Sequence, residues 1–486
     1  MELKEQKLTE IRNSLDVVLS DLELKSSKGS SIADVERALF SRLLSLGLQL
    51  LNFYLFLVYD LVHRSGCPTD SLGNKMHNTG KRVRPYLSIF GMLNINRNKY
   101  YSPIDKTYYP LDAHLSLPVG RYSYVFTDWL SYGSVDLDFK QSVEQLEHIL
   151  GHSLSSMQSS RQTYHLSKDV DSFYEQQDWS SIQDGTHLSV GYDGKGIPII
   201  RSETDRKEES AVVRLSRGQK KGVKKEATIS VSSSFTPQPR SKEQLLESLF
   251  LVHKKTDKSE LRHQWHEHKH IRAFLSDKTK AIEYGIDNLM KRDATAKKPI
   301  IVLIDGDRAL ENAVKKVCKQ RAIEHRVDAY ILDFIHLLEY VWKVANAHLG
   351  EKNPTRQEWV YQQAERLLGS QHERVLKEWK HILEHQKLSE NGQYQLERAI
   401  CYLSNRPHMI DYKTYLEKGY PITTGAVESA CGHFIKSRMD RNAMHWGKKG
   451  AQDMLNIRAI KKNQNWQEYL DYFIQKEQND KYKQVA

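Results

Sequence analysis

Apolar positions in the first 65 residues recur at helical spacing and predict two helices, separated by the polar residues 26–31. The second helix is expected to begin near Ser31, because acidic residues follow in what would be its first turn. Its most apolar part, residues 46–62, is interrupted by polar side chains such as Asp60 and is shorter than the roughly 20 apolar residues that span a membrane. We therefore expect a buried amphipathic helix there and no contact with a membrane.

Residues 80–118 alternate apolar and polar positions, carry aromatic side chains and predict a small hairpin or sheet. The helical period returns at Phe139, Gly151 interrupts it, and a second helix is expected after Ser153 or Ser155. The apolar face of the first of these helices consists of Val143, Leu146, Ile149 and Leu150. A helix, a glycine turn and a second helix are typical of a helix-turn-helix that reads the DNA major groove. An ordinary helical hairpin is the equally favoured alternative.

Strand patterns begin at His187. Residues 187–200 predict a strand, a bend at Asp193 and Gly194, and a second strand. Residues 227–235 predict a third strand, and helical sequence is expected to follow it.

Beyond about Asp293, five apolar residues predict a buried strand that ends at Asp305, and a shorter strand ends at Asp333. Residues 336–410 are helical in period, and a last helix is expected from about Gly425 to before Gly447. Strands alternating with helices in this order predict a mixed sheet with helices on its faces, in a multidomain α/β or α+β chain.

Composition sharpens this picture. A chain of 486 residues favours several domains over one, because a single core seldom exceeds roughly 250–300 residues. Lysine and arginine number 72 against 61 acidic residues, and the resulting net charge of +11 favours a polyanionic partner. The N-terminus has no signal-peptide pattern, and the four cysteines are far apart and form no CxxC pair, which suits a reducing, cytoplasmic compartment: Cys67, Cys318, Cys401 and Cys431.

Three acids stand where two-metal phosphodiester chemistry needs them, at strand ends and in the first turn of a helix: Asp193, Asp305 and Glu428. Each has a structural alternative. Asp193 with Gly194 is typical of a hairpin turn, and the acid after the buried strand can cap a helix, a role that Asp307 fills equally well. Together, in this order and on these elements, the acids favour a metal site more than any one of them does alone.

Several stretches of the chain resemble the ISKra-type insertion-sequence transposases, a family distantly related to Mutator-like enzymes. The resemblance rests on GYDGKGIPI, IVLIDGDRAL, ILDFIHLLEYVW and, most specifically, GAVESACGHFIKSRMDRNAMHWGKKGAQDMLNIRA. It extends through SIADVERALFSRLLSLGLQLL, RPYLSIFGMLNINRNKYY and YPLDAHLSLP, from about residue 30 to about residue 475. The family implies an RNase H-like catalytic core with a DDE triad and an all-helical insertion, which corresponds to residues 336–410.

Carried over by position, the family implies Asp193, Asp305 and Glu428 as the catalytic acids, which hold two Mg²⁺ or Mn²⁺ ions. Asp333 and His336 match its D-x-x-H motif, in which His336 organises the site or contacts DNA. A polar residue satisfied at a helix start is the alternative for His336. Relatives in this family also carry cysteines after the YY of the sheet segment. This chain has none there, so no metal is expected at that position.

Basic and aromatic residues near the third acid are candidates for DNA contact. Arginine and lysine clamp phosphates, and an exposed indole stacks on an unpaired base. The candidates are Lys436, Arg438, Arg441 and Trp446, with Trp342 as a second stacking residue. For any one of them, a surface charge or a core aromatic is the alternative. The histidine cluster His263, His266, His268 and His270 has a metal-binding composition but favours a solvated helix.

Together with these patterns, the resemblance implies a metal-dependent DNA transposase that binds the terminal inverted repeats of its element and joins them to target DNA. It would act as a homodimer or higher oligomer on DNA, in the nucleoid of a prokaryotic cell. A catalytically silent, sequence-specific DNA-binding protein and an RNase H-like nuclease are the alternatives. The expected domains are an N-terminal helical region, a sheet with a helix-turn-helix, the first part of the catalytic core, the insertion, and a C-terminal catalytic helix with a tail: residues 1–79, 80–180, 181–335, 336–415 and 416–486.

Overall fold

The computed structural model describes residues 2–152, 154–179, 182–200, 224–250, 267–423, 425–441 and 444–482, without the side chains of residues 425, 426 and 428. The chain forms two compact units. Unit 1 contains residues 1–173 and 465–486, and unit 2 contains residues 174–464. Residues 465–482 therefore belong to unit 1, whereas residues 416–464 belong to unit 2.

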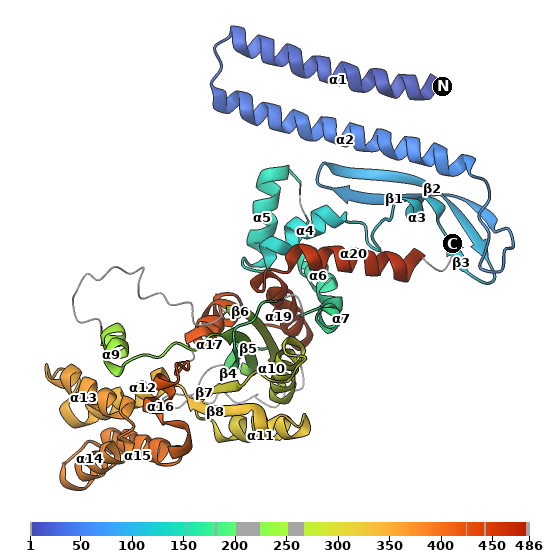
Figure 1. The fold of residues 1–486 in the computed structure, drawn as a ribbon. Helices are drawn as coiled ribbons and strands as arrows, with labels where there is room; N and C mark the ends of the chain where they lie inside the picture. Colours follow the sequence, from blue (N-terminus) through green and yellow to red (C-terminus); the bar gives the residue numbers. More distant parts are fainter. Residues whose placement is uncertain are drawn as a thin grey trace, which may run out of the picture. The chain divides into compact units, whose positions relative to one another are not determined.

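Unit 1 begins with the two predicted helices, α1 (Glu2–Ser27) and α2 (Ile32–Arg64). Ser31 caps α2 by accepting a hydrogen bond from the backbone N–H of Asp34, as expected for a helix that starts at this serine. A three-stranded antiparallel sheet follows, with β1 (His77–Ser88) paired to β2 (Gly91–Ser102) and β2 to β3 (Lys106–Tyr108). Figure 1 shows α1 and α2 side by side, with α2 along the β1–β2 hairpin.

Six helical segments complete unit 1: α3 (Pro110–His114), α4 (Tyr124–Ser134), α5 (Phe139–Leu150), α6 (Ser156–Leu166), the 3₁₀ segment Ser167–Asp169 and α20 (Trp466–Tyr482). A further helix, α7 (Val170–Gln176), leads from unit 1 into unit 2. Glu477 of α20 is buried and accepts hydrogen bonds from the backbone N–H of Val119 and from Tyr124 and His165. A buried carboxylate needs such partners, so these contacts fix the C-terminal helix within unit 1.

Unit 2 is built on a five-stranded mixed sheet in the order β6-β5-β4-β7-β8. The strands are β4 (His187–Pro198), β5 (Lys224–Phe235), β6 (Glu267–Leu275), β7 (Ile300–Ile304) and β8 (Val327–Leu332). β5 is antiparallel to both of its neighbours, whereas β4, β7 and β8 are parallel. All five residues of β7 are buried, and burial contributes roughly 1.5–3 kcal/mol for each side chain of this size. The expected mixed sheet is confirmed.

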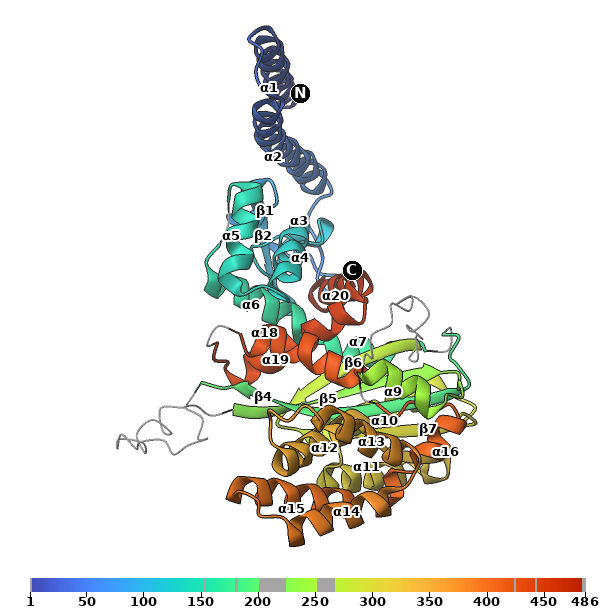
Figure 2. The same cartoon turned by 90° about the vertical axis from the view of Figure 1, so that its left-hand side faces the viewer.

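Helices cover both faces of this sheet (Figure 2). One face carries α10 (Lys278–Arg292), followed in the chain by α11 (Arg308–Gln320) and the 3₁₀ segment Glu324–Arg326. On the other face lie α17 (Gly425–Ala430) and α19 (Lys448–Lys462). Between these two, the chain continues as a π-helix, Cys431–Lys436, and α18 (Ser437–Met439).

The predicted helical insertion follows β8. It consists of α12 (Phe334–Leu349), α13 (Arg356–Leu368), α14 (His372–His385), α15 (Glu390–Ser404), the 3₁₀ segment Pro407–Met409 and α16 (Tyr412–Glu417). A short helix before β6, α9 (Lys242–Phe250), packs against α13. The insertion and the sheet share one continuous apolar core, so the insertion is part of unit 2.

Three expectations about these elements were wrong. The strand containing Asp193 and Gly194 does not bend there, because Asp193 pairs with Ile229 and Gly194 with Thr228 in an unbroken ladder. Residues 267–275 form a strand instead of a helix, since their alternating side chains pair with β5. His268 and His270 therefore lie on a strand, with His270 buried, and His263 and His266 lie outside the described residues.

Two smaller expectations also failed. The apolar run at residues 46–62 lies on a helix that is mostly exposed, because only Leu55 and Val58 of α2 are buried. On α5, Val143, Leu146 and Leu150 are buried as predicted, but Ile149 points to solvent and is 46% exposed.

Candidate functional site

Asp193 lies on β4, and Asp305 directly follows β7, the parallel strand beside it. In the β4–β7 ladder Gly191 is level with Leu303, so two residues further on Asp193 is level with Asp305. Residues that are level on parallel strands point to the same side of the sheet, and side chains two apart on one strand share a face. Both carboxylates therefore lie on the Gly191 face of the sheet. Asp193 lies within a strand, so a hairpin turn does not account for it.

The turn after β7 leaves the Asp305 side chain available for chemistry. Asp305 accepts one hydrogen bond, from the backbone N–H of Asp307, and it is partly exposed. Asp307 takes the capping role for α11 by accepting from the backbone N–H of Ala309. Burial raises the pKa of Asp305, and the charge of Asp193 adds to this, outweighing the effects of the Asp307 N–H and His336. Two carboxylates that repel each other in this way suit a bound cation.

Glu428 lies on α17, which packs on the same face of the sheet. A Cβ atom on Gly191 would lie 2.5 Å from Cγ2 of Val427, so the glycine lets α17 approach β4 closely. Val427 is the neighbour of Glu428, and Gly191 is two residues from Asp193 on the same face. The helix α17 thus packs on the sheet face that carries the acid pair, although the side chain of Glu428 lies outside the described part of the chain.

The ends of the site helix are held by backbone and buried side-chain contacts. Before α17, the carbonyl of Ile422 accepts a hydrogen bond from the N–H of Phe334 (3.0 Å), where α12 begins. After α17 the chain widens into a π-helix, a form often found at functional sites. The fully buried Arg458 donates to the carbonyls of His433 (2.7 Å) and Phe434 (2.6 Å) in that π-helix.

Asp333 and His336, the D-x-x-H pair, lie at the start of α12 next to Asp305. Asp333 is 1% exposed and caps α12 by accepting from the N–H of Ile335 (2.9 Å). Its own N–H donates to the carbonyl of Ile304, which ties the end of β8 to the end of β7. His336 is partly exposed and is close enough to Asp305 to stabilise its charge. The structure therefore supports a positioning role for Asp333 and leaves His336 facing the site.

The helical insertion contacts the acid turn directly, which the sequence did not predict. Tyr402 donates from its hydroxyl to the carbonyl of Asp305 (2.6 Å), and Arg406 donates from Nε to the carbonyl of Gly306 (2.7 Å). The Arg406 guanidinium stacks 4.1 Å over the Tyr402 ring, which in turn stacks on Tyr340 of α12 with centroids 4.0 Å apart. These stacked side chains of the insertion hold the turn at Asp305 and Gly306 in place through its carbonyl groups.

A lysine near the site was also not predicted from the sequence. Lys278, at the start of α10, donates to Asp307 (3.0 Å) and lies 3.6 Å from a carboxylate oxygen of Glu226. Partial burial lowers the pKa of Lys278, but Asp307 and Glu226 outweigh it and hold that pKa above its usual value. Glu226 in turn packs over Gly194, next to Asp193. No local motif marks these residues, because the pairing of β4 with β5 brings them together.

The predicted DNA-contacting residues fall into two groups. Lys436 and Arg441 are exposed, and Arg441 lies beyond the end of the helix. Arg438 and Trp446 are buried, at 1% and 4% exposure, and the guanidinium lies 4.9 Å over the indole ring. The Trp446 indole N–H donates to the carbonyl of Met439, and its backbone pairs with β4 beyond Asp193. Arg438 and Trp446 are therefore buried core residues, which was the alternative to DNA contact for each of them. Trp342 is partly buried beneath the guanidinium of Arg356.

The donor set fits a divalent metal as far as the structure describes it. Mg²⁺ takes few protein ligands, mostly carboxylates, and keeps water and phosphate oxygens for the rest. Asp193 and Asp305 supply two carboxylates from rigid strands. Among the described side chains no group of three histidines, cysteines or acids could hold a metal, and Glu428, the expected third ligand, is outside that set.

The predicted helix-turn-helix in unit 1 has well-defined ends. α5 ends at Gly151, whose φ of +72° is a left-handed conformation that glycine adopts without strain. Ser155 and Gln158 form a capping box at the start of α6. Arg161 of α6 is exposed, whereas Ser159 and Thr163 are buried against the neighbouring helices. α5 and α6 therefore form a helix pair in which one face of α6 is exposed to solvent, as a recognition helix requires.

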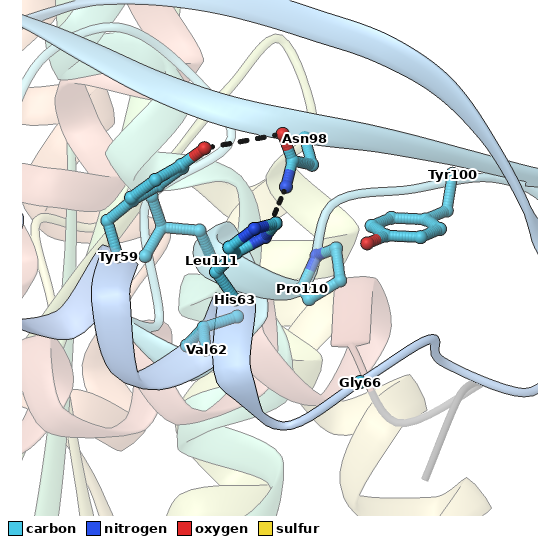
Figure 3. Close-up of a pocket in the computed structure, with 8 residues that line it drawn as sticks. All are labelled: Tyr59, Val62, His63, Gly66, Asn98, Tyr100, Pro110 and Leu111. Atoms are coloured by element: carbon cyan, nitrogen blue, oxygen red, sulfur yellow. Dashed lines mark hydrogen bonds between the residues drawn. The ribbon is translucent and has the colours of Figure 1, made fainter.

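A small pocket lies at the C-terminal end of α2, within unit 1 (Figure 3). Tyr59 donates to Asn98 of β2 (3.5 Å), and the Asn98 amide donates to Nδ1 of His63 (3.2 Å). The lining residues are Tyr59, Val62, His63, Gly66, Asn98, Tyr100, Pro110 and Leu111. None of the predicted catalytic residues lines this pocket, and its polar contacts fasten α2 to the sheet.

Comparison of the sequence with models of known protein families, and with curated proteins, finds no match. Among the described helices, α2 is long and apolar enough to span a membrane by length and composition alone, with 11% of its most apolar window buried.

Proposed function

We propose that this chain is a metal-dependent DNA transposase with a DDE site formed by Asp193, Asp305 and Glu428. It hydrolyses a phosphodiester at the ends of its own mobile element and joins the freed 3′-hydroxyl to target DNA. The chain acts in the cytoplasm, where nucleoid DNA is accessible.

One observation carries this proposal: an acid on β4 lies beside an acid that directly follows the neighbouring parallel strand β7, and the helix of the third acid packs on the same sheet face. The surrounding mixed sheet, with one antiparallel strand and a helical insertion after β8, is the architecture expected of an RNase H-like transposase core. The resemblance of the sequence to ISKra-type transposases supports the same conclusion.

The acids lie on rigid elements, and this placement keeps them in position without reorganisation during the reaction. Asp193 and Asp305 would hold Mg²⁺ or Mn²⁺ from the strands, and Glu428 from α17. Two such ions, when bound, activate the attacking oxygen and stabilise the leaving one. Tyr402 and Arg406 keep the Asp305 turn in place by holding its carbonyls.

DNA binding would involve exposed cations. Lys436 and Arg441 lie beyond α17 along the chain, where they can neutralise phosphates next to the acids. In unit 1, α6 with Arg161 is the candidate recognition helix for the terminal inverted repeats. Two transposon ends must be paired, so the DNA-bound form has at least two copies of the chain.

The test is cleavage of a duplex that carries the inverted repeats flanking this gene, in the presence of Mg²⁺. Wild-type protein should cut at the repeat boundary, and Asp305→Asn and Glu428→Gln should not. Asp287→Asn, which changes an acid of α10 paired with Arg321 and away from the acid pair, is the matched control and should cut like the wild type.

Other results would favour other functions. Equal cutting by wild type and Asp305→Asn means that the triad is misassigned. Tight, metal-independent binding of the repeats without cutting supports a silent DNA-binding protein. Preferential cutting of RNA–DNA hybrids or junctions supports an RNase H-like nuclease.

A further inference from the structure

A stripe of large apolar side chains along α2 is exposed to solvent. Phe40, Leu43, Leu50, Tyr54, Leu57 and Leu61 have exposed fractions of 45%, 50%, 48%, 53%, 37% and 56%. Large apolar side chains scattered singly over a surface are ordinary, but a continuous row of them marks a contact surface. We refer to these six residues as the α2 stripe.

The spacing within the α2 stripe is that of a helix packing against another helix. Successive members are three, seven, four, three and four residues apart, which is the alternation of three and four found at the a and d positions of a coiled coil. The position missing from this pattern is Gly47, and the ring of Phe90 packs against it. A row with this period suits packing against a partner helix on either side of Gly47.

The other two sides of α2 already have partners within unit 1. The sheet side is packed through Leu55 and Val58, both buried. The α1 side is joined by the ion pair of Arg42 with Asp21 (3.4 Å) and by Lys7, whose amine lies 5.6 Å from the centre of the Phe56 ring. The α2 stripe occupies the third side, where no described part of the chain buries it.

We propose that the α2 stripe is the interface through which two copies of this chain dimerise, with the two α2 helices antiparallel. This dimer forms without DNA, and its existence does not depend on the proposed function. The occupant must be a long apolar helix face with the same period, and a second copy of the chain supplies one.

The ends of the stripe favour the antiparallel arrangement. The exposed Glu36 lies just before the stripe, and Arg64, which also pairs with Asp60 of the same helix (2.7 Å), lies just after it. In an antiparallel pair the acid end of one α2 lies near the arginine end of the other, whereas a parallel pair places like charges together. Antiparallel helices also set their macrodipoles in opposite directions.

The size of the surface suits a stable dimer. Six large side chains, each about half exposed, with the helix flanks between them, present on the order of 600–800 Å² on each copy, close to the roughly 800 Å² per partner of a specific interface. A closely spaced set of apolar side chains is also typical of an obligate interface.

The chemistry of α2 favours a protein partner over a lipid surface. Helices that lie on anionic membranes carry excess lysine and arginine beside the apolar face. α2 has three arginines and three acids, so its side chains other than histidine have no net charge. Spanning a bilayer would also require α2 to leave the sheet, where Leu55 and Val58 are buried.

The experiment compares the full-length wild type with a variant carrying Leu43→Glu, Leu50→Glu and Leu57→Glu, by sedimentation velocity over a wide range of concentration without DNA. Wild type should be a dimer, and the variant should show a dimer dissociation constant raised at least about 100-fold. All three side chains are solvent-exposed in the single chain, so circular dichroism and the thermal midpoint should stay close to wild type.

The matched control places the same three charges on exposed leucines of unit 1 outside the stripe: Leu3→Glu, Leu24→Glu and Leu72→Glu. This control should dimerise like wild type. A monomeric wild type, or a stripe variant that dimerises as well as the control, overturns the proposal. A monomeric wild type that sediments with phosphatidylserine vesicles, while the stripe variant does not, assigns the stripe to a membrane surface instead.

Cysteine crosslinking tests the direction of the helices. Oxidation of a mixture of Phe40→Cys and Leu61→Cys proteins should give crosslinked heterodimers above the wild-type background, which has exposed Cys67 and Cys401. A homodimer crosslink formed by Phe40→Cys alone, with no Phe40→Cys–Leu61→Cys heterodimer in the mixture, overturns the antiparallel arrangement.

Discussion

The ends of β7 and β8 offer a comparison between two regions with nearly the same sequence pattern. β7 is wholly apolar and β8 ends in two buried apolar residues, each strand is followed at once by an aspartate, and each leads into a helix. After β8 the helix begins at Phe334, so Asp333 must cap it and is 1% exposed. After β7, Gly306 and Asp307 intervene, Asp307 caps α11, and Asp305 is partly exposed beside Asp193.

Because Gly306 and Asp307 intervene after β7, Asp307 caps the helix and the side chain of Asp305 is not needed for capping. An aspartate that caps a helix uses its oxygens on backbone N–H groups and has less capacity left for a ligand. Where the chain supplies a second acid two residues later, the first keeps its free oxygens for a cation. Under the proposed function, the position of the helix start, more than the strand end itself, distinguishes the expected metal ligand from the capping acid.

The largest effect is expected at the uncapped acid. Asp305→Asn should lower strand cleavage at least about 1,000-fold, because a neutral amide removes a metal-binding charge. The thermal midpoint should not fall, since Asp305 makes one backbone hydrogen bond that an asparagine can also accept. Cleavage of inverted-repeat DNA and thermal unfolding measure the two quantities. If Asp305→Asn retained cleavage, Asp305 would not be a metal ligand, and its difference from the capping Asp333 would have no functional meaning.

Substitutions in the turn between Asp305 and Asp307 are also expected to lower stability and cleavage. Gly306 has a φ of +86°, and an added Cβ would lie 2.6 Å from Nε of Arg406. Gly306→Ala should cost about 2–3 kcal/mol of stability and lower cleavage on the order of 100-fold, by displacing Asp305. Gly369→Ala, where the nearest atoms lie at an ordinary 3.5 Å, is the control and should be close to neutral in both assays. Equal effects of the two changes would mean that the Gly306 turn is not special.

Arg406 holds the Gly306 turn from the insertion, and no corresponding arginine was predicted there. Arg406→Met should lower cleavage about 10-fold and stability by roughly 1–2 kcal/mol, through lost hydrogen bonds to the Gly306 and Tyr402 carbonyls. Arg398→Met, an exposed arginine of α15 that stacks on Tyr394, should change neither. A loss of stability without any loss of cleavage would show that the insertion supports the fold but not the site.

Local sequence was enough to predict the elements with strong local signals. Five consecutive apolar residues predict β7, the Asp307 position predicts a helix start, and the glycine and serine around residues 151–155 predict the ends of α5 and α6. These features depend on neighbours in the chain, which is why pattern and structure agree.

Features that depend on distant partners could not be predicted. Asp193 followed by glycine is typical of a turn, but the serine-rich β5 pairs along its whole strand and keeps it extended. The strand at residues 267–275 is polar in composition, and its pairing with β5 decides its structure. Tyr402 and Arg406 reach the acid turn from about 100 residues away, so no local motif could reveal them.

The comparison also predicts a moderate effect at the capping acid. Asp333→Ala should cost about 1–2 kcal/mol of stability and lower cleavage a few-fold, because it removes the cap of α12. Asp333→Asn keeps a capping oxygen and should stay close to wild type in both measurements. Loss of cleavage in the asparagine variant, with an unchanged thermal midpoint, would instead make Asp333 a ligand and contradict the division of roles.

The smallest effect is expected at Asp307, the acid that takes over capping after β7. Asp307→Ala removes the side-chain acceptor for the Ala309 N–H and the contact with Lys278, at a cost of about 1 kcal/mol. The backbone N–H that donates to Asp305 is unchanged, so cleavage should stay within a few-fold of wild type. Asp307→Asn should restore the stability by capping α11 again. If Asp307→Ala abolishes cleavage while Asp305→Asn does not, the two acids have exchanged roles, and the metal-binding position lies at the helix cap.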